Sequence, residues 1–458
     1  MNMIRGFSVS NFRSFNDTQS ISWVPSKIVR HKKHIFESGK GKVLKGSLIF
    51  GANAGGKSNL VHAIDFAKNV ILNGTDSVNS DKCYFRVDGN NYNIPGVFQF
   101  DILIDNEEYS YGFAISYATK TIISEWLSKK DDNGNDVDIF NRDVDDNGVS
   151  HVSTDIEIQS EDEKKRLDIY FEDFGENITV ALKKKTMLND IALRYSAGDG
   201  VFRDIAKVFG WFINLLIIFP SSKYNGIIED TENDELRQLL SSMLNYFDTG
   251  IEHVNNTNVD FDKIMGALPI GDFEELKTQI SNDLLNSKTE MLRINDQLYK
   301  LVKDDKGNTV AREILSDHGN PEDQFEYGDE SDGTQRLFDL IPLFYKTNQN
   351  KVVIIDEIDR SLHTNAVRRF IELFFSLTEG TDRQIIATTH DSNLLDLDLM
   401  RQDEIWFVER DFDHSSKIYS LNRFKERFDK KVNKEYLLGR YGAIPVFKEG
   451  FEIVDGVQ

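Results

Sequence analysis

The residues with the clearest chemical potential form a short glycine-rich segment near the N-terminus. Positions 51–58 read GANAGGKS, which fits the pattern G-x-x-x-x-G-K-[ST]. Glycines let the backbone curl so that successive N–H groups point at phosphate oxygens, and a following helix N-terminus adds positive potential. The apolar stretch SLIF precedes the segment and a helical pattern over 58–72 follows it. The sequence therefore predicts a loop that binds the phosphates of a nucleotide.

Each residue of this loop has an expected part in binding. Lys57 should reach the terminal phosphates, which makes it a catalytic residue as well, and Ser58 should offer its hydroxyl to a magnesium ion. The expected cofactors are therefore ATP and Mg²⁺. The predicted ATP-binding set is Gly51, Ala52, Asn53, Ala54, Gly55, Gly56, Lys57, Ser58 and Asn59.

A second chemical segment is an apolar strand that ends in acids. Positions 351–359 read KVVIIDEID, and such a run is typical of a buried parallel strand, at whose carboxyl end ligands bind. We expect Asp356 to hold Mg²⁺ and Glu357 to orient and deprotonate the attacking water. Lys57 and Asp356 lie 299 positions apart. This spacing indicates that a large insertion splits the nucleotide-binding fold.

The segment before the acidic strand resembles a known motif. Positions 330–337 read ESDGTQRL, which resembles the signature LSGGQ of the ABC-type ATPases. Ser331 and Gly333 match that motif, and Asp332 stands where a glycine is usual. The resemblance implies that Ser331 and Gly333 contact the γ-phosphate of ATP bound to a second copy of the chain. A serine hydroxyl, backbone N–H groups and a helix N-terminus suit that contact.

Two segments after the acidic strand extend the resemblance. Positions 358–363 read IDRSLH, similar to the ABC D-loop with Asp359 at its centre. Positions 385–390 read IIATTH, an apolar strand that ends in His390. The resemblance implies that Asp359 takes part in the contact between copies. It also implies that His390 is the catalytic switch residue that senses the γ-phosphate.

Two candidates lie in the N-terminal part. Positions 11–15 read NFRSF, which resembles the opening of Rad50-like and OLD-like ATPase heads, where the arginine lies over the nucleotide. Arg13 is therefore an expected ATP-binding residue, and a surface arginine at a strand end is the alternative. Gln99, in the alternating stretch VFQFD, is the candidate Q-loop ligand of Mg²⁺. A solvent-facing glutamine is the alternative there.

Together the motifs resemble the AAA15 branch of ABC-type ATPases, which is related to OLD-family heads and to Rad50- and SMC-like heads. The expected fold is α/β: a P-loop ATPase head whose split nucleotide-binding fold carries an antiparallel β meander, plus a mainly helical insertion. Alternating apolar residues predict the meander over 97–127. We expect the longest helix over 272–303. The expected parts are an N-terminal lobe over 1–160, the insertion over 161–325 and a C-terminal lobe over 326–458.

Composition limits the classes of function. The chain has 458 residues, a net charge of −22 and one cysteine, which excludes an intrachain disulfide and fits a reducing compartment. Its longest apolar run, at 211–220, is shorter than the ~20 residues that span a bilayer. We therefore expect a cytoplasmic protein with no membrane association. The negative charge does not indicate DNA binding, which would need a local basic patch.

Many members of the AAA15 branch belong to bacterial anti-phage systems such as PARIS, Septu and Gabija. Only 68 residues follow His390, too few for the Toprim nuclease that OLD and Gabija proteins carry. The resemblance implies a PARIS-like sensor or regulatory ATPase that self-associates into a dimer or higher homo-oligomer, answers a phage-encoded trigger and controls a separate effector, expected to be a nuclease. A Septu-like defence ATPase and a Rad50/RecF-like DNA-repair clamp are the alternatives.

Overall fold

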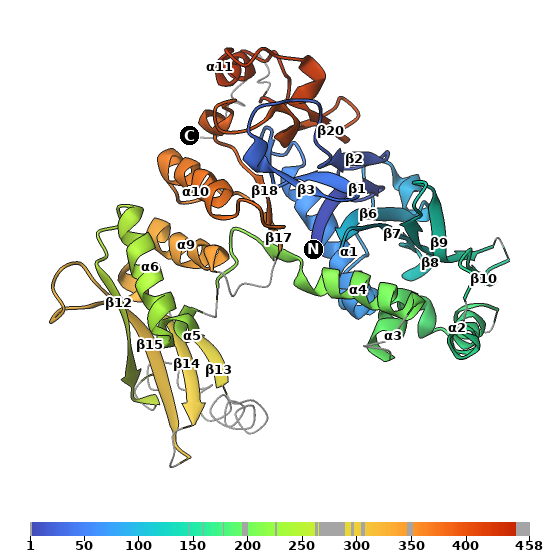
Figure 1. Cartoon of the computed structure of the whole chain (residues 1–458), viewed down its shortest axis with the longest axis horizontal. Coiled ribbons are helices and arrows are strands. Elements are labelled where there is room, and N and C mark those ends of the chain that lie inside the picture. Colours follow the sequence, from blue (N-terminus) through green and yellow to red (C-terminus); the bar gives the residue numbers. More distant parts are fainter. Residues whose placement is uncertain are drawn as a thin grey trace, which may run out of the picture. The chain divides into compact units, whose positions relative to one another are not determined.

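The chain folds as two compact units (Figure 1). The first comprises Met1–Pro220, Gln349–Asp359 and Arg368–Gln458, and the second comprises Ser221–Asn348 and Arg360–Val367. The boundaries expected at 160 and 325 do not coincide with these units, because residues 161–220 fold with the N-terminal part. The computed structural model describes residues 2–145, 147–158, 160–176, 178–194, 200–224, 227–261, 264, 289–294, 297–303, 307–345 and 351–445.

The expected meander is present in the first unit as part of a seven-stranded antiparallel sheet. Its strand order is β10-β9-β8-β7-β6-β1-β2. The hairpin turns at Gly134 and Gly148 have φ angles of 84° and 78°, a left-handed conformation that glycine adopts without strain. The strands are β1 (Asn2–Ser10), β2 (Gln19–Ser22), β6 (Gly96–Ile104), β7 (Glu107–Ser116), β8 (Thr121–Lys130), β9 (Asp136–Val144) and β10 (Ser150–Ser153).

A six-stranded, mainly parallel sheet positions the chemical residues. Its order is β11-β17-β18-β5-β19-β20, with the first five strands parallel and β20 antiparallel to β19. The strand that leads to His390, β18, lies between the strand of the phosphate loop, β5, and the acidic strand, β17. The strands are β5 (Gly46–Phe50), β11 (Leu216–Ile218), β17 (Val352–Ile355), β18 (Gln384–Thr388), β19 (Ile405–Arg410) and β20 (Ser416–Ser420).

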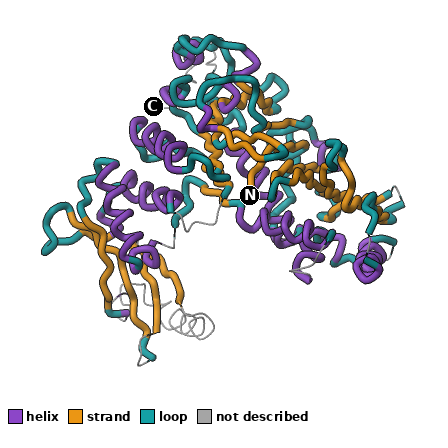
Figure 2. Tube along the Cα trace, in the orientation of Figure 1, coloured by secondary structure: helices purple, strands orange, loops and turns teal. Residues whose placement is uncertain are grey.

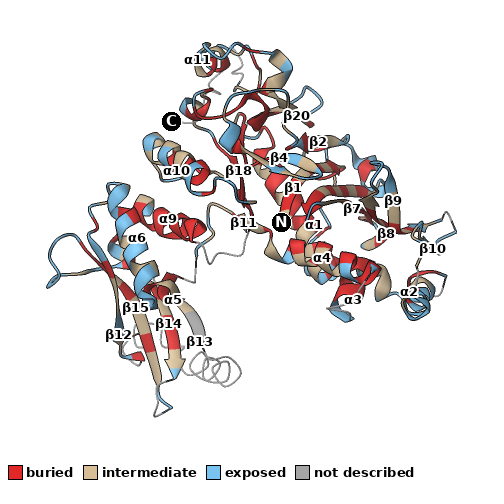
Figure 3. Ribbon diagram, in the orientation of Figure 1, coloured by how far each residue is buried: buried red, intermediate tan, exposed pale blue. Residues whose placement is uncertain are grey.

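Helix α1 (Lys57–Asn73) follows the phosphate loop and lies in the core of the first unit. One apolar cluster joins its inner face to residues of both sheets, and Figure 3 shows the buried residues along this helix and the parallel strands. Phe212 of α4 packs edge-on against Phe100 of β6, with ring centroids 5.0 Å apart. This unit also contains β3 (Ile35–Ser38), β4 (Gly41–Leu44), α2 (Glu161–Phe174), α3 (Met187–Arg194), α4 (Val201–Asn214), α10 (Thr364–Leu377, which begins in the second unit) and α11 (Val432–Leu437).

The described part of the insertion expected over 161–325 contains more helix than strand, but its portion in the second unit is built on a sheet that was not expected. The core of the second unit is an antiparallel sheet of order β12-β15-β14-β13, with β16 paired to β15 (Figure 2). The helix expected over 272–303 is wrong for 289–294 and 297–303, which form strands β13 and β14; 272–288, 295 and 296 lie outside the described residues. The elements are α5 (Ile227–Glu232), α6 (Asp234–Tyr246), β12 (His253–Val259), β13 (Thr289–Ile294), β14 (Gln297–Lys303), β15 (Thr309–Asp317), β16 (Phe325–Glu326) and α9 (Asp332–Leu340).

The error arose because the local sequence favours a helix. The stretch QLYKLVK of β14 is rich in leucine and lysine, which favour helices in isolation. In the structure it pairs with β15, where Leu301 faces Ala311 across the two strands, and both residues are fully buried. Burial in a sheet overrides a weak local preference. Among the described residues, no helix combines the length and apolar character needed to cross a membrane.

Candidate nucleotide-binding site

The phosphate loop runs from the end of β5 to the start of α1 and is closely packed from behind. Gly56 has a φ of 115°, and a Cβ atom there would lie 2.2 Å from Ser416 Oγ. A Cβ atom on Gly51 would lie 2.3 Å from the carbonyl oxygen of Val408. Glycine is thus required at both positions. At Gly56 both the backbone conformation and the close approach of Ser416 require it, and at Gly51 the close approach of Val408 alone requires it. Strands β19 and β20 therefore form the back wall of the loop.

Lys57 is the first residue of α1, and only 4 % of it is exposed. Its Nζ atom donates hydrogen bonds to the carbonyl oxygens of Gly51 at 2.7 Å and Ala52 at 3.2 Å. Burial lowers the pKa of Lys57 to about 8, and the nearby carboxylates of Asp356, Asp359 and Glu357 only partly oppose this. The lysine thus lies along the loop, beside the backbone that would surround a phosphate.

Ser58 and Asp356 form the expected pair of magnesium ligands. Ser58 Oγ donates to Asp356 Oδ1 at 3.2 Å, across 298 positions of the chain. Asp356 is buried, and its Oδ1 atom also accepts a hydrogen bond from Thr388 Oγ1 at 2.6 Å. A hydroxyl oxygen and a carboxylate oxygen are hard ligands of the kind that Mg²⁺ takes together with phosphate oxygens. The residues therefore fit that ion.

Glu357 adopts a backbone conformation that is unfavourable for its type. Its φ is 51°, in the left-handed region that residues other than glycine rarely adopt. Its backbone N–H donates to Thr388 Oγ1 at 2.8 Å. The same threonine hydroxyl thus holds both acids that follow β17. Strain of this kind is typical of functional sites, where the surrounding structure enforces it.

His390 joins the acids to the phosphate loop. Its Nδ1 atom lies 3.3 Å from Lys57 Nζ, and its Nε2 atom lies 3.7 Å from Glu357 Oε1. Its backbone N–H donates to the Asp359 carboxylate, at 3.2 Å to Oδ2. Burial, followed by the positive charge of Lys57, lowers the pKa of His390. The neutral ring is therefore favoured, and its Nδ1 atom can accept a hydrogen bond from the lysine.

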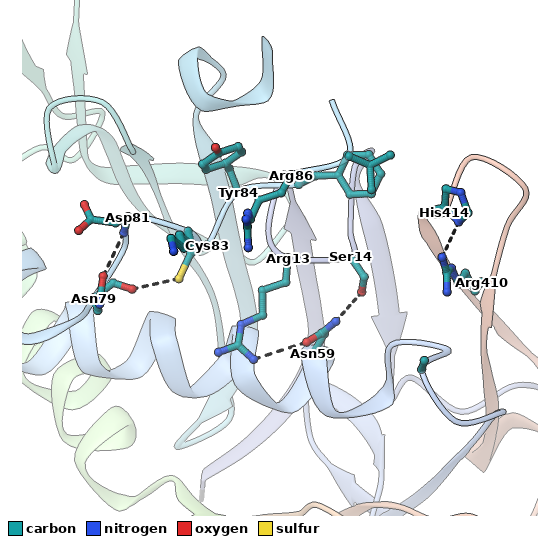
Figure 4. A pocket seen from close by; sticks show the side chains of 14 residues that line it. Arg13, Ser14, Asn59, Asn79, Asp81, Cys83, Tyr84, Arg86, Arg410 and His414 are labelled. Atoms are coloured by element: carbon teal, nitrogen blue, oxygen red, sulfur yellow. Dashed lines mark hydrogen bonds between the residues drawn. The ribbon is translucent and has the colours of Figure 1, made fainter. Parts of the chain in front are cut away.

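Arg13 lies beside the first turn of α1 (Figure 4). Its Nη1 atom is 3.5 Å from Asn59 Oδ1, and its φ of 49° places it in the left-handed region. Asn59 Nδ2 donates to Ser14 Oγ at 2.8 Å, and Ser416 Oγ contacts the same Ser14 oxygen at 2.8 Å. The NFRSF segment is thus tied to the loop and to β20.

The structure does not bring Gln99 to the magnesium ligands. Gln99 lies in β6 opposite Ser8 of β1, and its Nε2 atom donates to Asp101 Oδ1 at 3.1 Å. The cavity that it lines is bounded by residues of the antiparallel sheet and its margins, such as Arg5 and Tyr109, and by no residue of the phosphate loop. The role expected for Gln99 has no support from this position.

The signature residues lie in the second unit, at the N-terminus of α9. Ser331 is the N-cap, and its Oγ accepts from the backbone N–H of Thr334 at 3.2 Å. A Cβ atom on Gly333 would lie 2.7 Å from the carbonyl oxygen of Ser361, so only glycine fits there without a shift of the backbone. Asp332, the first residue of the helix, is exposed.

Sequence reasoning missed Thr388, Ser14 and Ser416. Thr388 contacts both acids, and the two serines buttress the loop. The one available signal was the position of Thr388 in ATTH, two residues before His390 and at the carboxyl end of a parallel strand. The two serines carry no such signal, because they contact each other across about 400 positions of the chain.

No curated protein matches the chain in sequence. It is similar to the SmcHead bound to the C-winged helix domain of ScpA, with 17% identity over 93% of this chain and 100% of that chain and a TM-score of 0.43. The Smc head domain with an extended coiled coil bound to the C-terminal domain of ScpA, derived from Pyrococcus furiosus, gives 17% identity over 95% and 100% and a TM-score of 0.40. The SMC head domain from Thermotoga maritima gives 13% identity over 91% and 98% and a TM-score of 0.34. The parallel sheet and the phosphate loop between β5 and α1 give this chain the α/β fold of a P-loop ATPase head.

A family model matches the chain over residues 47–171 and 210–396. These ranges contain the phosphate loop, the acidic strand, the signature and His390, and they cover more than half of the chain. The chain therefore belongs to the family described as "AAA domain, putative AbiEii toxin, Type IV TA system".

Proposed function

We propose that this protein binds Mg²⁺-ATP and hydrolyses it to ADP and phosphate. The observation that carries the proposal is the meeting of Lys57, Asp356, Glu357 and His390: Thr388 contacts both acids, and His390 contacts Lys57 and lies near Glu357. The first two groups suit the phosphates and the metal, and the last two suit the attacking water and the γ-phosphate. These residues follow the carboxyl ends of three neighbouring strands of one sheet, β5, β17 and β18.

Each group has a distinct task in the proposed reaction. Lys57 neutralises charge on the terminal phosphates, and Mg²⁺, when bound at Ser58 and Asp356, would do the same from the other side. Glu357 accepts a proton from the water that attacks the γ-phosphorus. His390, with its backbone fixed by Asp359, is placed to contact the γ-phosphate oxygens. Phosphoryl transfer depends on such positioning and charge compensation.

Paired variants test these assignments. Lys57→Ala should lower ATP affinity by about 100-fold, because it removes the ammonium that binds the terminal phosphates. Glu357→Gln should retain wild-type ATP affinity and lose hydrolysis. Affinity is measured by calorimetry and turnover by phosphate release, with Glu372→Gln, at a solvent-facing ion pair of α10, as control. Equal loss of ATP binding in Lys57→Ala and Glu357→Gln would contradict the division of roles.

We further propose that the site is completed by a second copy of the chain. Ser331, Gly333 and Asp359 would contact the ATP of the partner copy. The exposed N-terminus of α9 supports this, since helix N-termini attract anions. The γ-phosphate would then link the two copies.

Complementation tests the shared site. Ser331→Arg should leave ATP binding to each copy intact and abolish ATP-dependent dimerisation and turnover. Mixing it with Lys57→Ala should restore part of the activity, because each mixed dimer keeps one intact composite site. The absence of rescue, once exchange of subunits is demonstrated by mass spectrometry of mixed dimers, would count against a shared site.

At the level of the cell, we propose a PARIS-like regulatory ATPase that holds a separate effector, such as a nuclease, inactive until a phage-encoded trigger arrives. ATP-driven closure would supply the free energy, as the difference in ATP affinity between open and closed states. The family description names a type IV toxin–antitoxin system, which supports a defence role. Expression of this chain alone should be harmless, and protection against phage should require co-expression of the effector.

A second candidate follows from the same description. It contains the word "toxin", which favours a chain that is itself harmful when its antitoxin is absent. The growth of cells that express the chain alone separates the two candidates. Growth arrest that Glu357→Gln abolishes would favour the toxin, and unimpaired growth favours the regulatory ATPase.

A further inference from the structure

A cavity of about 700 Å³ lies directly beside the phosphate loop (Figure 4). One side of it is formed by Arg13 and by Asn59 of α1. A second side is the segment 79–87, and a third is the hairpin that joins β19 to β20. All of these belong to the first unit. None of the motifs recognised in the sequence accounts for the last two sides.

Three consecutive residues at the start of α1 fix the direction of the triphosphate. Lys57 contacts His390, where the γ-phosphate is expected, and Ser58 contacts Asp356, where Mg²⁺ is expected. Asn59 contacts Arg13 instead. Arg13 and Asn59 line the cavity. The end of the triphosphate away from His390 must therefore leave the loop next to the cavity.

We infer that this cavity receives the nucleoside of ATP, and that Arg86 and Arg410 contact it. The inference rests on the proposed function, because it takes the phosphate loop to bind ATP, but the residues it assigns lie outside the phosphate-binding and hydrolytic groups. Arg86 comes from the segment 79–87, and Arg410 is the last residue of β19. The two side chains therefore approach the cavity from different parts of the fold.

The chemistry of the walls suits a planar, electron-rich base. Guanidinium groups stack on aromatic faces by cation–π attraction, and the phenol ring of Tyr84 and the imidazole of His414 are further planar groups in the lining. Within the described part of the chain, no carboxylate pairs with Arg86 or Arg410; the second contacts His414. Both guanidinium groups are thus available to a ligand.

The charge of the cavity also differs from that of the whole chain. The lining contains four cationic side chains, and its one acid, Asp81, forms an ion pair with Lys120 outside the cavity. The chain as a whole has a net charge of −22. This local excess of positive charge suits the electron-rich face of a base. The lining residues concerned are Arg13, Lys82, Arg86 and Arg410.

Comparison of two ligands tests the inference on the full chain. ATP and inorganic tripolyphosphate, each with Mg²⁺, share the phosphates, but only ATP carries a nucleoside. Arg86→Ala and Arg410→Ala should each weaken ATP about tenfold, as expected for lost stacking, and leave the affinity for tripolyphosphate unchanged. Arg427→Ala is the matched control, because its side chain is 85% exposed, pairs with Asp429 and lies outside the cavity.

The outcomes separate this inference from the proposed function. If the wild-type protein binds neither ligand, the ATP site itself is wrong. If the wild-type protein binds ATP and tripolyphosphate with equal affinity, the nucleoside lies elsewhere and only this inference fails. The same conclusion follows if the two arginine variants leave ATP affinity unchanged, or if they weaken the binding of both ligands equally.

The single cysteine of the chain provides a second measurement. Cys83 lines the cavity and is 8% exposed, so a nucleoside in the cavity should slow its alkylation. ATP should slow the reaction with iodoacetamide at least fivefold, whereas tripolyphosphate should not slow it. Equal protection by both ligands, or none by ATP, would overturn the assignment of the cavity.

Discussion

Lys57 Nζ lies 3.3 Å from His390 Nδ1, although 333 positions of the chain separate the two residues. The ammonium also donates to two carbonyl oxygens of the phosphate loop. An incoming phosphate must therefore compete with these three acceptors. The contact makes the charge state of the lysine and the position of the histidine depend on each other.

ATP affinity should fall as the pH rises above about 8. Burial lowers the pKa of Lys57 to about 8 in the free protein, and the bound phosphates favour the charged form. Below pH 8 the lysine is already protonated, so affinity is flat. Above it, binding must take up a proton, and affinity should fall up to about tenfold per pH unit.

Calorimetry between pH 7 and 9.5, in buffers of different ionisation enthalpy, measures both the affinity and the proton uptake. Lys57→Arg is the control, since a guanidinium stays charged across this range. A flat profile in the wild-type protein, with no proton uptake at pH 9, would show that Lys57 is not the titrating group.

Thr388→Val should separate hydrolysis from binding. The valine keeps the shape of the side chain but removes the hydroxyl that contacts Asp356 and the backbone of Glu357. We expect kcat to fall about 10- to 100-fold, because misplaced catalytic groups cost that much, with ATP affinity within about threefold. Thr378→Val is the control, since this buried threonine donates only to Phe374 within its own helix end. Unchanged turnover would remove the threonine from the site.

Asp332→Asn should strengthen ATP-dependent dimerisation. The exposed carboxylate of Asp332 lies at the start of α9, where the proposed dimer would place the partner's γ-phosphate, and like charges repel. In a Glu357→Gln background that retains ATP, the dimer dissociation constant should fall about tenfold, most clearly at low salt. Light scattering measures it.

Asp329→Asn provides the comparison for charge alone, because this exposed acid is three residues away and caps a separate turn. If both variants change dimerisation equally, net charge and not the phosphate contact is responsible.

Glu125→Ala should destabilise the first unit. Glu125 and Arg142 are both fully buried, 3.7 Å apart, and the carboxylate also accepts from the backbone N–H groups of Met187 and Leu188 at the start of α3, at 2.7 and 3.0 Å. Its loss leaves a buried guanidinium without its ion-pair partner, which costs about 3–5 kcal/mol of unfolding free energy.

Denaturant unfolding followed by circular dichroism measures this change. Glu161→Ala, at the exposed start of α2, should change the unfolding free energy by less than about 0.5 kcal/mol. A similar small effect at Glu125 would mean that the buried pair contributes little.

The sequence by itself determined the parts of the site that are contiguous in the chain. GANAGGKS between a strand and a helix, and KVVIIDEID with its acids at a strand end, specify local geometry through glycine conformation and a continuous apolar run. The antiparallel meander was predicted from alternating apolar residues, and its strands are neighbours in sequence.

Only the tertiary structure decided which distant residues meet. The strand order places β18 between β5 and β17, so Thr388 reaches both acids and His390 reaches Lys57. The sheet of the second unit joins β12 to β15, with His253 opposite Asp317, and the cavity depends on the approach of segment 79–87 and the β19–β20 hairpin to Arg13. Such contacts gain their free energy from burial shared by segments far apart in the chain, and that energy is not encoded in the local pattern of either segment.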